Sequence, residues 1–304
     1  MDRRKIRTDL AVEEQERLTE EAERIKGVIL EEDEEPPDVH ITRVRILDEE
    51  GARVMGKPVG TYLTLESRRM SQEDEDYHRD VSEVFAEKLE ELLPKGWNSL
   101  LVAGLGNHHV TSDSLGPRVV DNLWITRHLD RTGRMISGIV PGVMAQTGME
   151  SAEIIKGIVR ETRPDVVVAI DALAARSVHR LGSTIQLSDT GIQPGSGVGN
   201  HRNKLNQESL GVPVIAVGVP TVVSAAAIVY DTLDALTTVL EQSEVTSSLS
   251  GTIKSMDMDD QYRLIQELLH PRLGPMFVTP KDIDAVVKRL SFTISEGMNM
   301  AFHA

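Results

Sequence analysis

Two aspartates in this sequence stand where short buried strands are expected to end. Asp171 closes the apolar run V-V-V-A-I-D, and Asp113 lies in the loop after an earlier apolar run, Leu100–Leu105. Because the carboxyl ends of parallel strands meet at one edge of a sheet, the two carboxylates can lie close together there. Carboxylates within hydrogen-bonding distance share a proton, and such a pair supplies a general base to activate water and a general acid to polarise a carbonyl. The alternative is that each aspartate only caps a turn or a helix.

The segment that carries Asp113, Ser99–Arg118, has the pattern of a strand, a glycine-containing turn and a helix. Gly116-Pro117 begins the expected helix, because the missing N–H of proline leaves no helical hydrogen bond unmade in the first turn. The glycines also invite comparison with nucleotide-binding loops. A G-x-G-x-x-G fingerprint starting at Gly104 would need glycine at the position of His109, and the G-K-[ST] of a P-loop is absent, so nucleotide binding is not expected.

A glycine-rich stretch, Ser188–Asn200, could bring backbone close to a ligand, a peptide or a neighbouring chain. A serine nucleophile elbow, G-x-S-x-G, is excluded because Pro194 and Val198 occupy its two glycine positions. A backbone nest that binds an anion and a plain irregular loop both stay open. We predict substrate-binding or supporting roles for four residues in this stretch and in the first loop: Asn107, Asp189, Gly195 and Gly197.

Two adjacent histidines, His108-His109, lie beside the Asp113 loop and make a metal site conceivable, since imidazole and carboxylate suit several divalent ions. No H-E-x-x-H or comparable spacing accompanies them. We therefore expect partly exposed loop histidines, no metal and no cofactor. The absence of cysteine excludes disulfides, thiolate metal sites and a cysteine nucleophile.

The composition is that of a globular protein, with 40% hydrophobic and 27% charged residues in 304. The 48 acidic and 33 basic residues leave a net charge of −15, which repels phosphate backbones and argues against direct nucleic-acid binding. There is no apolar run of membrane-spanning length and no signal-peptide core after Met1. We expect a soluble, cytoplasmic protein with no membrane partner.

Short apolar strands alternate with helices in the middle of the chain, which predicts a parallel sheet with helices on its faces. These strands are expected at Leu100–Leu105, Ile136–Val140, Val166–Ile170 and Val214–Val217, and the helices at Pro117–Asp130, Glu150–Arg163 and Thr221–Glu241. The segment Ala172–Val212, which delays the fourth strand, is expected to hold another strand at Ser183–Leu187. Two β-branched strands and an amphipathic helix come before them, at Val39–Leu47, Thr61–Leu65 and Asp76–Leu93. We predict an α/β fold with a mostly parallel twisted central sheet flanked by helices and an extra N-terminal antiparallel strand layer.

The whole chain, residues 1–304, is expected to form a single domain. Its expected parts are an N-terminal helix and acidic linker (1–37), a strand layer and helix (38–98), an α/β core (99–241), a flexible connector (242–258) and C-terminal helices (259–304). The linker prediction rests on the acidic run Glu31–Glu35 before Pro36-Pro37, which is typical of a solvated segment.

Longer runs are far more specific than these short motifs. They are R-T-D-L-A-V-E (Arg7–Glu13), G-L-G-N with T-S-D-S-L-G-P, P-G-V-M-A-Q-T-G (Pro141–Gly148), A-I-D-A-L-A-A-R (Ala169–Arg176), S-T-I-Q-L-S-D-T-G-I-Q-P-G-S-G-V-G-N, P-V-I-A-V-G-V-P-T-V-V (Pro213–Val223) and M-F-V-T-P-K. Over nearly its whole length the chain resembles the spore germination proteases of endospore-forming bacteria, which degrade small acid-soluble spore proteins. It is also distantly similar to hydrogenase maturation peptidases, which use related positions to read a bound nickel.

The resemblance implies an atypical aspartic endopeptidase, a hydrolase whose catalytic aspartates fall on Asp113 and Asp171. It further implies a homotetramer that is made as a zymogen and activated late in sporulation by removal of a short propeptide. Its substrates would be the DNA-coating proteins of the spore core, cleaved during germination, which places the protein in the cytoplasm of the forespore and in the spore core.

The sequence departs from the family pattern in three places. The matching run already begins at Arg7, so we expect a truncated or missing propeptide. Ser112 replaces the family's proline in the Asp113 loop, and the segment around 242–258 is shorter than expected. Neither of these last two changes removes an aspartate.

Two other functions stay open. One is a metal-dependent or metal-sensing peptidase of the hydrogenase-maturation kind. The other is a non-catalytic acidic protein that binds basic spore proteins through charges such as Glu31–Glu35, in a salt-sensitive manner.

Overall fold

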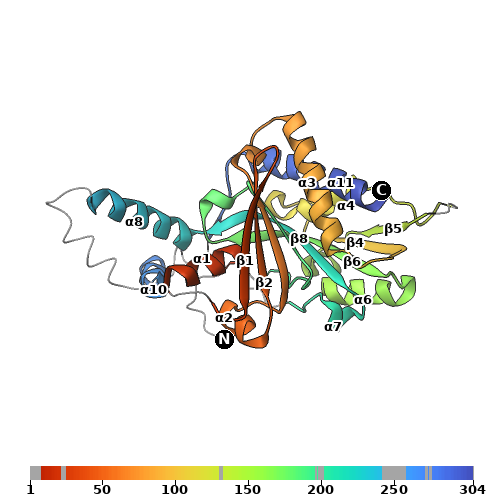
Figure 1. Cartoon of the computed structure of the whole chain (residues 1–304), viewed down its shortest axis with the longest axis horizontal. Coiled ribbons are helices and arrows are strands. Elements are labelled where there is room, and N and C mark those ends of the chain that lie inside the picture. Colours follow the sequence, from red (N-terminus) through yellow and green to blue (C-terminus); the bar gives the residue numbers. More distant parts are fainter. Residues whose placement is uncertain are drawn as a thin grey trace.

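The computed structural model describes residues 8–21, 25–129, 133–195, 197, 202–241, 258–270, 273 and 276–303. In this part of the chain the strands form one mixed sheet in the order β1-β2-β3-β7-β8-β6-β4-β5, and β9 pairs with β8 (Figure 1). The strands are β1 (Val28–Glu35), β2 (Val39–Ile46), β3 (Gly60–Glu66), β4 (Ser99–Gly104), β5 (Met135–Ile139), β6 (Val166–Ala175), β7 (Thr184–Ser188), β8 (Val214–Ser224) and β9 (Phe277–Val278).

Helices cover both faces of the sheet (Figure 1). The helices are α1 (Ala11–Glu21), α2 (Glu49–Met55), α3 (Glu75–Leu92), α4 (Leu115–Asp121), α5 (Met144–Thr147), α6 (Ser151–Thr162), α7 (Gln207–Leu210), α8 (Ala225–Glu241), α10 (Met258–Leu269) and α11 (Ile283–His303), with short 3-10 turns η1 (Arg68–Ser71), η2 (Thr111–Asp113) and η3 (Val178–Arg180). The helices α3, α4 and α11 pack on one face, and α6 and α7 pack on the other. Among the described residues, no helix is long and apolar enough to cross a membrane.

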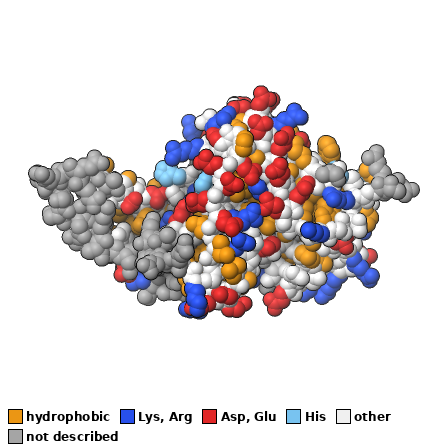
Figure 2. Space-filling model, viewed as in Figure 1, with side chains coloured by type: hydrophobic (Ala, Val, Ile, Leu, Met, Phe, Trp, Pro, Cys, Tyr) orange, Lys and Arg blue, Asp and Glu red, His pale blue; other side chains and the backbone are white. Residues whose placement is uncertain are grey.

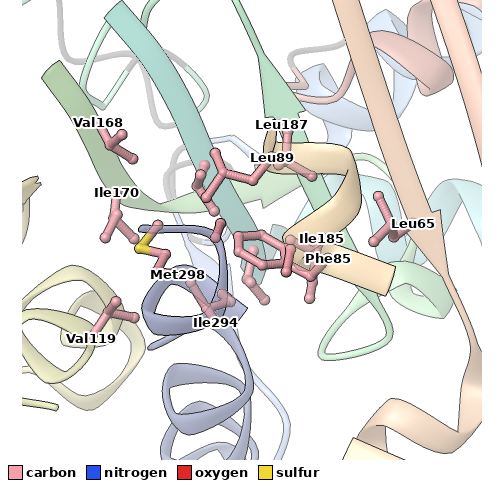
Figure 3. Packing of buried hydrophobic residues seen from close by; sticks show 14 of the residues in the cluster. Leu65, Phe85, Leu89, Val119, Val168, Ile170, Ile185, Leu187, Ile294 and Met298 are labelled. Carbon is pink, nitrogen blue, oxygen red and sulfur yellow. The ribbon is translucent and has the colours of Figure 1, made fainter. Parts of the chain in front are cut away.

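The strand β6 lies in the middle of the sheet, parallel to both of its neighbours, β4 and β8. Its side chains alternate between the two faces, as in any strand. Val168 and Ile170 point toward Met298 of α11 (Figure 3), whereas Val167 and Ala169 join the cluster that contains the apolar side of α6. Burial on both faces explains why this strand reads as a continuous apolar run.

The predicted fold class is confirmed: the core strands β5, β4, β6 and β8 are parallel, and helices flank them. The N-terminal strands β1, β2 and β3 are antiparallel, as predicted, but they continue the same sheet because β3 pairs with β7. They therefore extend one edge of the parallel core.

The prediction of an acidic linker at Glu31–Glu35 is wrong, because this run belongs to the strand β1. Two of its five acidic residues have basic partners: Glu31 lies 2.7 Å from Arg45 of β2, and Glu35 lies 2.5 Å from Lys88 of α3. The Glu31–Arg45 pair joins neighbouring strands, where opposite charges stabilise the pairing and like charges alone would oppose it. Figure 2 shows acidic and basic side chains interleaved over this face of the molecule.

Three predicted boundaries on the core also change. The helix expected at Pro117–Asp130 is the shorter α4, which ends where the N–H groups of Asn122 and Leu123 bond back three residues. The helix expected at Thr221–Glu241 begins only at Ala225, because the residues before it pair with β6 and β9. The strand β6 likewise runs past Asp171 to Ala175, and residues 242–257 of the predicted connector lie outside the described residues.

Candidate active site

Asp171 sits inside β6, next to Gly218 of β8, with only 6% of its surface exposed. Along its face of the strand, Val167 and Ala169 belong to the apolar cluster under α6, and Leu173 belongs to a second cluster on the side of α1 and α8. The side chain of Asp171 thus lies in the same row, between two apolar clusters. One of its oxygens, Oδ1, accepts a hydrogen bond of 3.0 Å from the N–H of Ala172.

The surroundings raise the pKa of Asp171 well above its usual range. Burial has the largest effect, since it disfavours the charged form, and the negative charges of Asp113 and Asp9 add to it. The hydrogen bond from Ala172 and the positive charge of Arg202 act in the opposite direction and are weaker. Asp171 therefore binds its proton more tightly than an ordinary aspartate does.

Asp113 lies on a turn that is bonded to β6, the strand that contains Asp171. After β4 the N–H of Leu105 donates to the carbonyl of Ile170, 2.8 Å away, which ties the loop to β6. The N–H of Asn107 then donates to the carbonyl of Asp113 at 2.9 Å and closes the loop on itself. Between these two bonds, Gly106 has a φ of 109°, and a side chain there would collide with the Asp113 carbonyl.

Burial also raises the pKa of Asp113, although this carboxylate is less deeply buried than Asp171. The positive charge of Arg202 and a hydrogen bond from the Asn107 backbone oppose the rise. The charge of Asp113 in turn contributes to the raised pKa of Asp171, so the structure brings the two predicted aspartates into electrostatic contact.

Two charged residues that sequence reasoning did not single out belong to this region. Arg202 follows the glycine-rich loop, and its charge acts on both Asp113 and Asp171. Asp9 is held against the end of β6: its N–H donates to the carbonyl of Ala174 at 3.0 Å, and its Oδ2 accepts from the N–H of Ala174 at 2.9 Å. The run R-T-D-L-A-V-E carried the only sequence signal for Asp9, as part of the family resemblance.

The segment around Asp9 is built into the body of the protein. Leu10 and Ala11 are completely buried, and the side chain of Gln186 on β7 accepts from the N–H of Ala11 at 2.7 Å. Gln186 occupies the same row of the sheet as Asp171, because both residues pair with Gly218 of β8. The N-terminal segment therefore borders the aspartate pair directly.

The four predicted supporting residues fall in different places. Asn107 lies in the Asp113 loop, where its side-chain oxygen accepts from the N–H of His109 at 3.0 Å and from Gln146 at 3.1 Å. Gly197 packs against the Asp9 carboxylate, close to the aspartate pair. Gly195, with a φ of 71°, belongs to the same glycine-rich loop.

Asp189 lies apart from the pair. It follows β7, whose last residue, Ser188, pairs with Ala216, two residues before the Gly218 that neighbours Asp171. Because β7 runs antiparallel to β8, Asp189 continues away from Asp171, and its Oδ1 accepts from the N–H of Thr61 at 2.8 Å. This geometry gives Asp189 a role in joining β3 to β7.

The histidines beside the loop do not converge on the aspartates. His108 points its Nε2 toward Asp121 of α4, 3.8 Å away. Within the described residues, no group of three His, Asp or Glu side chains is arranged to hold a metal ion. The expectation of a metal-free site remains a prediction.

Comparison with known proteins now adds to this geometry. A family model described as germination protease matches residues 6–244. The chain belongs to the germination protease family. Curated members named germination protease include one from Caldanaerobacter subterraneus subsp. tengcongensis, 48% identical over 97% of this chain and 94% of that relative, and one from Clostridium perfringens, 45% identical over the same shares.

The family extends to a germination protease from Bacillus cytotoxicus, which is 42% identical over 98% of this chain and 94% of that relative. The resemblance seen in the sequence is thus confirmed, and membership of the germination protease family supports a peptidase. A solved [NiFe] hydrogenase maturation protease, HycI from Thermococcus kodakarensis, aligns with 44% of this chain and 80% of its own at 22% identity. Its TM-score of 0.33 is too low to carry an argument.

Proposed function

We propose that the protein is an endopeptidase that cleaves small acid-soluble spore proteins during germination, and that Asp113 and Asp171 hydrolyse the peptide bond as a pair. The observation that carries this proposal is the buried Asp171 carboxyl, whose pKa is raised by its own burial and by the charge of Asp113. Family membership supports the peptidase activity, and the electrostatic contact of the two aspartates supports the aspartic mechanism.

The two environments assign different roles to the aspartates. Asp171 is the more deeply buried, and its pKa is raised well above the usual range, so it carries the proton and serves as the general acid. Asp113 is more accessible, and its pKa is raised less than that of Asp171, so we assign to it the negative charge and the role of general base. The pair titrates as a unit, so its pKa values belong to both groups together.

Hydrolysis then proceeds in two steps. Asp113 takes a proton from water while the water oxygen bonds to the scissile carbonyl carbon, and Asp171 gives its proton to the carbonyl oxygen. In the second step Asp113 gives its proton to the amide nitrogen, the C–N bond breaks, and Asp171 recovers a proton from one hydroxyl of the tetrahedral intermediate. Both aspartates return to their starting states, as catalysis requires.

The test is cleavage of a purified small acid-soluble spore protein, followed by mass spectrometry of the fragments. Asp113→Asn and Asp171→Asn should each lower kcat by about 10²–10⁴, the usual contribution of a general acid or base. Asp165→Asn is a matched control, because Asp165 lies at the amino end of β6 and accepts hydrogen bonds from the N–H groups of Asn98 and Ser99. Full activity in Asp113→Asn or Asp171→Asn would refute the aspartate pair.

Two further outcomes separate the alternative functions. Loss of activity in a chelator, restored by one added divalent ion, would replace the aspartic mechanism with a metal-dependent one. Salt-sensitive binding of spore proteins without fragments would indicate an acidic binder. Glu31 and Glu35 already have basic partners, Arg45 and Lys88, which reduces the charge that these two residues offer to a basic protein.

We also propose that the protein assembles as a homotetramer in the forespore and spore core and is made as a zymogen. The burial of Leu10 and Ala11 next to the aspartate pair supports control of the site by the N-terminal segment. Light scattering tests the tetramer, since a monomer in solution would refute it. Mass spectrometry of the protein from spores tests the zymogen, because one unchanged N-terminus before and after activation would refute processing.

A further inference from the structure

The strand β8 contains a residue with no partner on β6. Leu173 pairs with Pro220, but the next residue of β6, Ala174, pairs with Val222. Thr221 is therefore the extra residue of a bulge, a feature that is rare between parallel strands. Proline before it fits this arrangement, because a proline in a sheet is tolerated at a bulge. The shift begins two residues after Asp171.

The bulge directs the side chain of Thr221 to the Asp113 turn. Its hydroxyl donates a hydrogen bond of 2.6 Å to the carbonyl of Ser112, the residue immediately before Asp113. Thr221 is 1% exposed and Ser112 is half-buried, so the bond is partly shielded from water, and its loss would leave a partly buried carbonyl without this partner. Bulges beside active sites commonly re-aim a side chain in this manner.

The other side of Thr221 is held by the chain before α11. The hydroxyl of Thr279 donates to the carbonyl of Thr221 at 2.8 Å, and Val278 of β9 pairs with Val223 of β8. The residue is thus fixed to the sheet through its backbone and to the catalytic turn through its side chain.

We propose that Thr221 is a positioning residue that holds Asp113 against Asp171 through its hydrogen bond to Ser112. The inference rests on the proposed function, because it assumes that these aspartates act together. Asp171 is fixed by the sheet itself, whereas Asp113 lies on a turn that has to be anchored to that sheet. The Thr221 hydroxyl supplies such an anchor from β8, the strand that neighbours Asp171.

Loss of the Thr221 hydroxyl should affect the chemical step more than substrate binding. Without the hydroxyl, the turn can shift away from β6, and a displacement of about 1 Å at a reacting group costs about a hundredfold in rate. The charge of Asp113 would then act less strongly on Asp171. The upper apparent pKa in the pH profile of kcat should therefore move downward, because the negative charge of Asp113 is one of the causes that raise it.

The experiment compares three variants of the full chain with a small acid-soluble spore protein as substrate. Thr221→Val replaces the hydroxyl by a methyl group of similar size and should lower kcat by about ten- to a hundredfold, with KM unchanged within about twofold. Thr221→Ser keeps the hydroxyl and should keep both kcat and the pH profile. Thr279→Val is the matched control, since it removes the other hydroxyl bonded to this bulge and leaves Ser112 untouched.

The outcomes separate this inference from the proposed function. If Asp113→Asn and Asp171→Asn are inactive while Thr221→Val keeps full kcat and the normal pH profile, Thr221 is no positioning residue and the aspartate pair stands. An equal loss in Thr221→Val and Thr279→Val would also overturn the inference, because general loosening of the bulge would explain both. If Thr221→Val does not fold, a loss of kcat in folded Thr221→Ser would refute the positioning role of Thr221. Full activity in Asp113→Asn would refute the proposed function itself.

Discussion

The two aspartates of the site have the same side chain but are held in place in different ways. Asp171 is part of β6, paired on one side with β8 and packed between two apolar clusters, so the sheet alone determines its position. Asp113 ends the short turn η2, and its position depends on a glycine, on backbone bonds within its loop and on a side chain from β8. One carboxylate is thus held by regular structure and the other by individual contacts.

This difference separates the chemistry of the two groups. The sheet buries Asp171 and raises its pKa well above the usual range, whereas the turn leaves Asp113 more accessible and with a smaller rise in pKa. Small changes in the turn should therefore alter activity strongly, and changes at Asp171 should be visible in stability as well as activity. The following variants test this contrast.

Among the residues that support the aspartate pair, the largest effect on kcat is expected at Gly106. Gly106→Ala would place a methyl group against the Asp113 carbonyl and should lower kcat by about a hundredfold. Gly96→Ala is the matched control: Gly96 also has a positive φ, 77°, but a Cβ there would meet no atom within 4 Å. Both variants place alanine at a positive φ, which costs about 1–2 kcal/mol of unfolding free energy. Urea unfolding would measure this cost in each variant, and equal activities would show that the turn does not require glycine for catalysis.

Asp171→Asn should stabilise the fold at neutral pH. A carboxyl whose folded pKa is raised binds more protons folded than unfolded, so the free energy of unfolding falls as pH rises from about 4, the unfolded value, toward the raised folded value. Between these two pKa values the free energy of unfolding falls by about 1.4 kcal/mol for each pH unit. In urea unfolding from pH 4 to 7, the free energy of unfolding should decline less steeply with pH in the variant than in the wild type. Identical slopes in the two proteins would contradict a raised pKa of Asp171.

Asn107→Ala should have an intermediate effect, since its side chain joins His109 and Gln146 without touching Asp113. Loss of these two exposed hydrogen bonds costs about 1 kcal/mol of unfolding free energy, and we expect kcat to fall about tenfold as the loop loosens. Asn122→Ala, on the exposed end of α4, provides the control and should behave like the wild type. A rise in KM alone would instead indicate that Asn107 binds substrate.

The smallest effect is expected at Asp189. Asp189→Ala removes the acceptor for the N–H of Thr61 and should lower the free energy of unfolding by about 1 kcal/mol. Its kcat and KM should stay within about twofold of the wild type, because Asp189 lies at the far end of β7. A large drop in kcat would place this aspartate in the active site after all.

Much of the scaffold was predictable because its signal is local. The run V-V-V-A-I predicts a strand buried on both faces, and the helix predicted at Asp76–Leu93 matches α3, whose apolar residues repeat at helical spacing. The location of Asp113 and Asp171 at one region of the sheet followed from the same alternation of strands and helices.

The errors arise where partners are distant in the chain. Glu31–Glu35 looked like a linker because its basic partners, Arg45 and Lys88, come from another strand and a helix. Asp9 and Arg202 enter the site only through folding, so spacing along the sequence could not reveal them. The sequence predicts the start of a helix at Thr221 for the same reason, since the pairing of β8 with β6 on both sides of the bulge is a tertiary property.

The central claim is that Asp113 and Asp171 act on each other. It is tested most directly by NMR titration of the Asp171 carboxyl carbon in the wild type and in Asp113→Asn. In the wild type Asp171 should titrate well above the ordinary aspartate value of about 3.9, and in the variant its pKa should fall while staying above that value, because burial remains the largest cause. An ordinary pKa in the wild type, or an unchanged pKa in Asp113→Asn, would contradict the account.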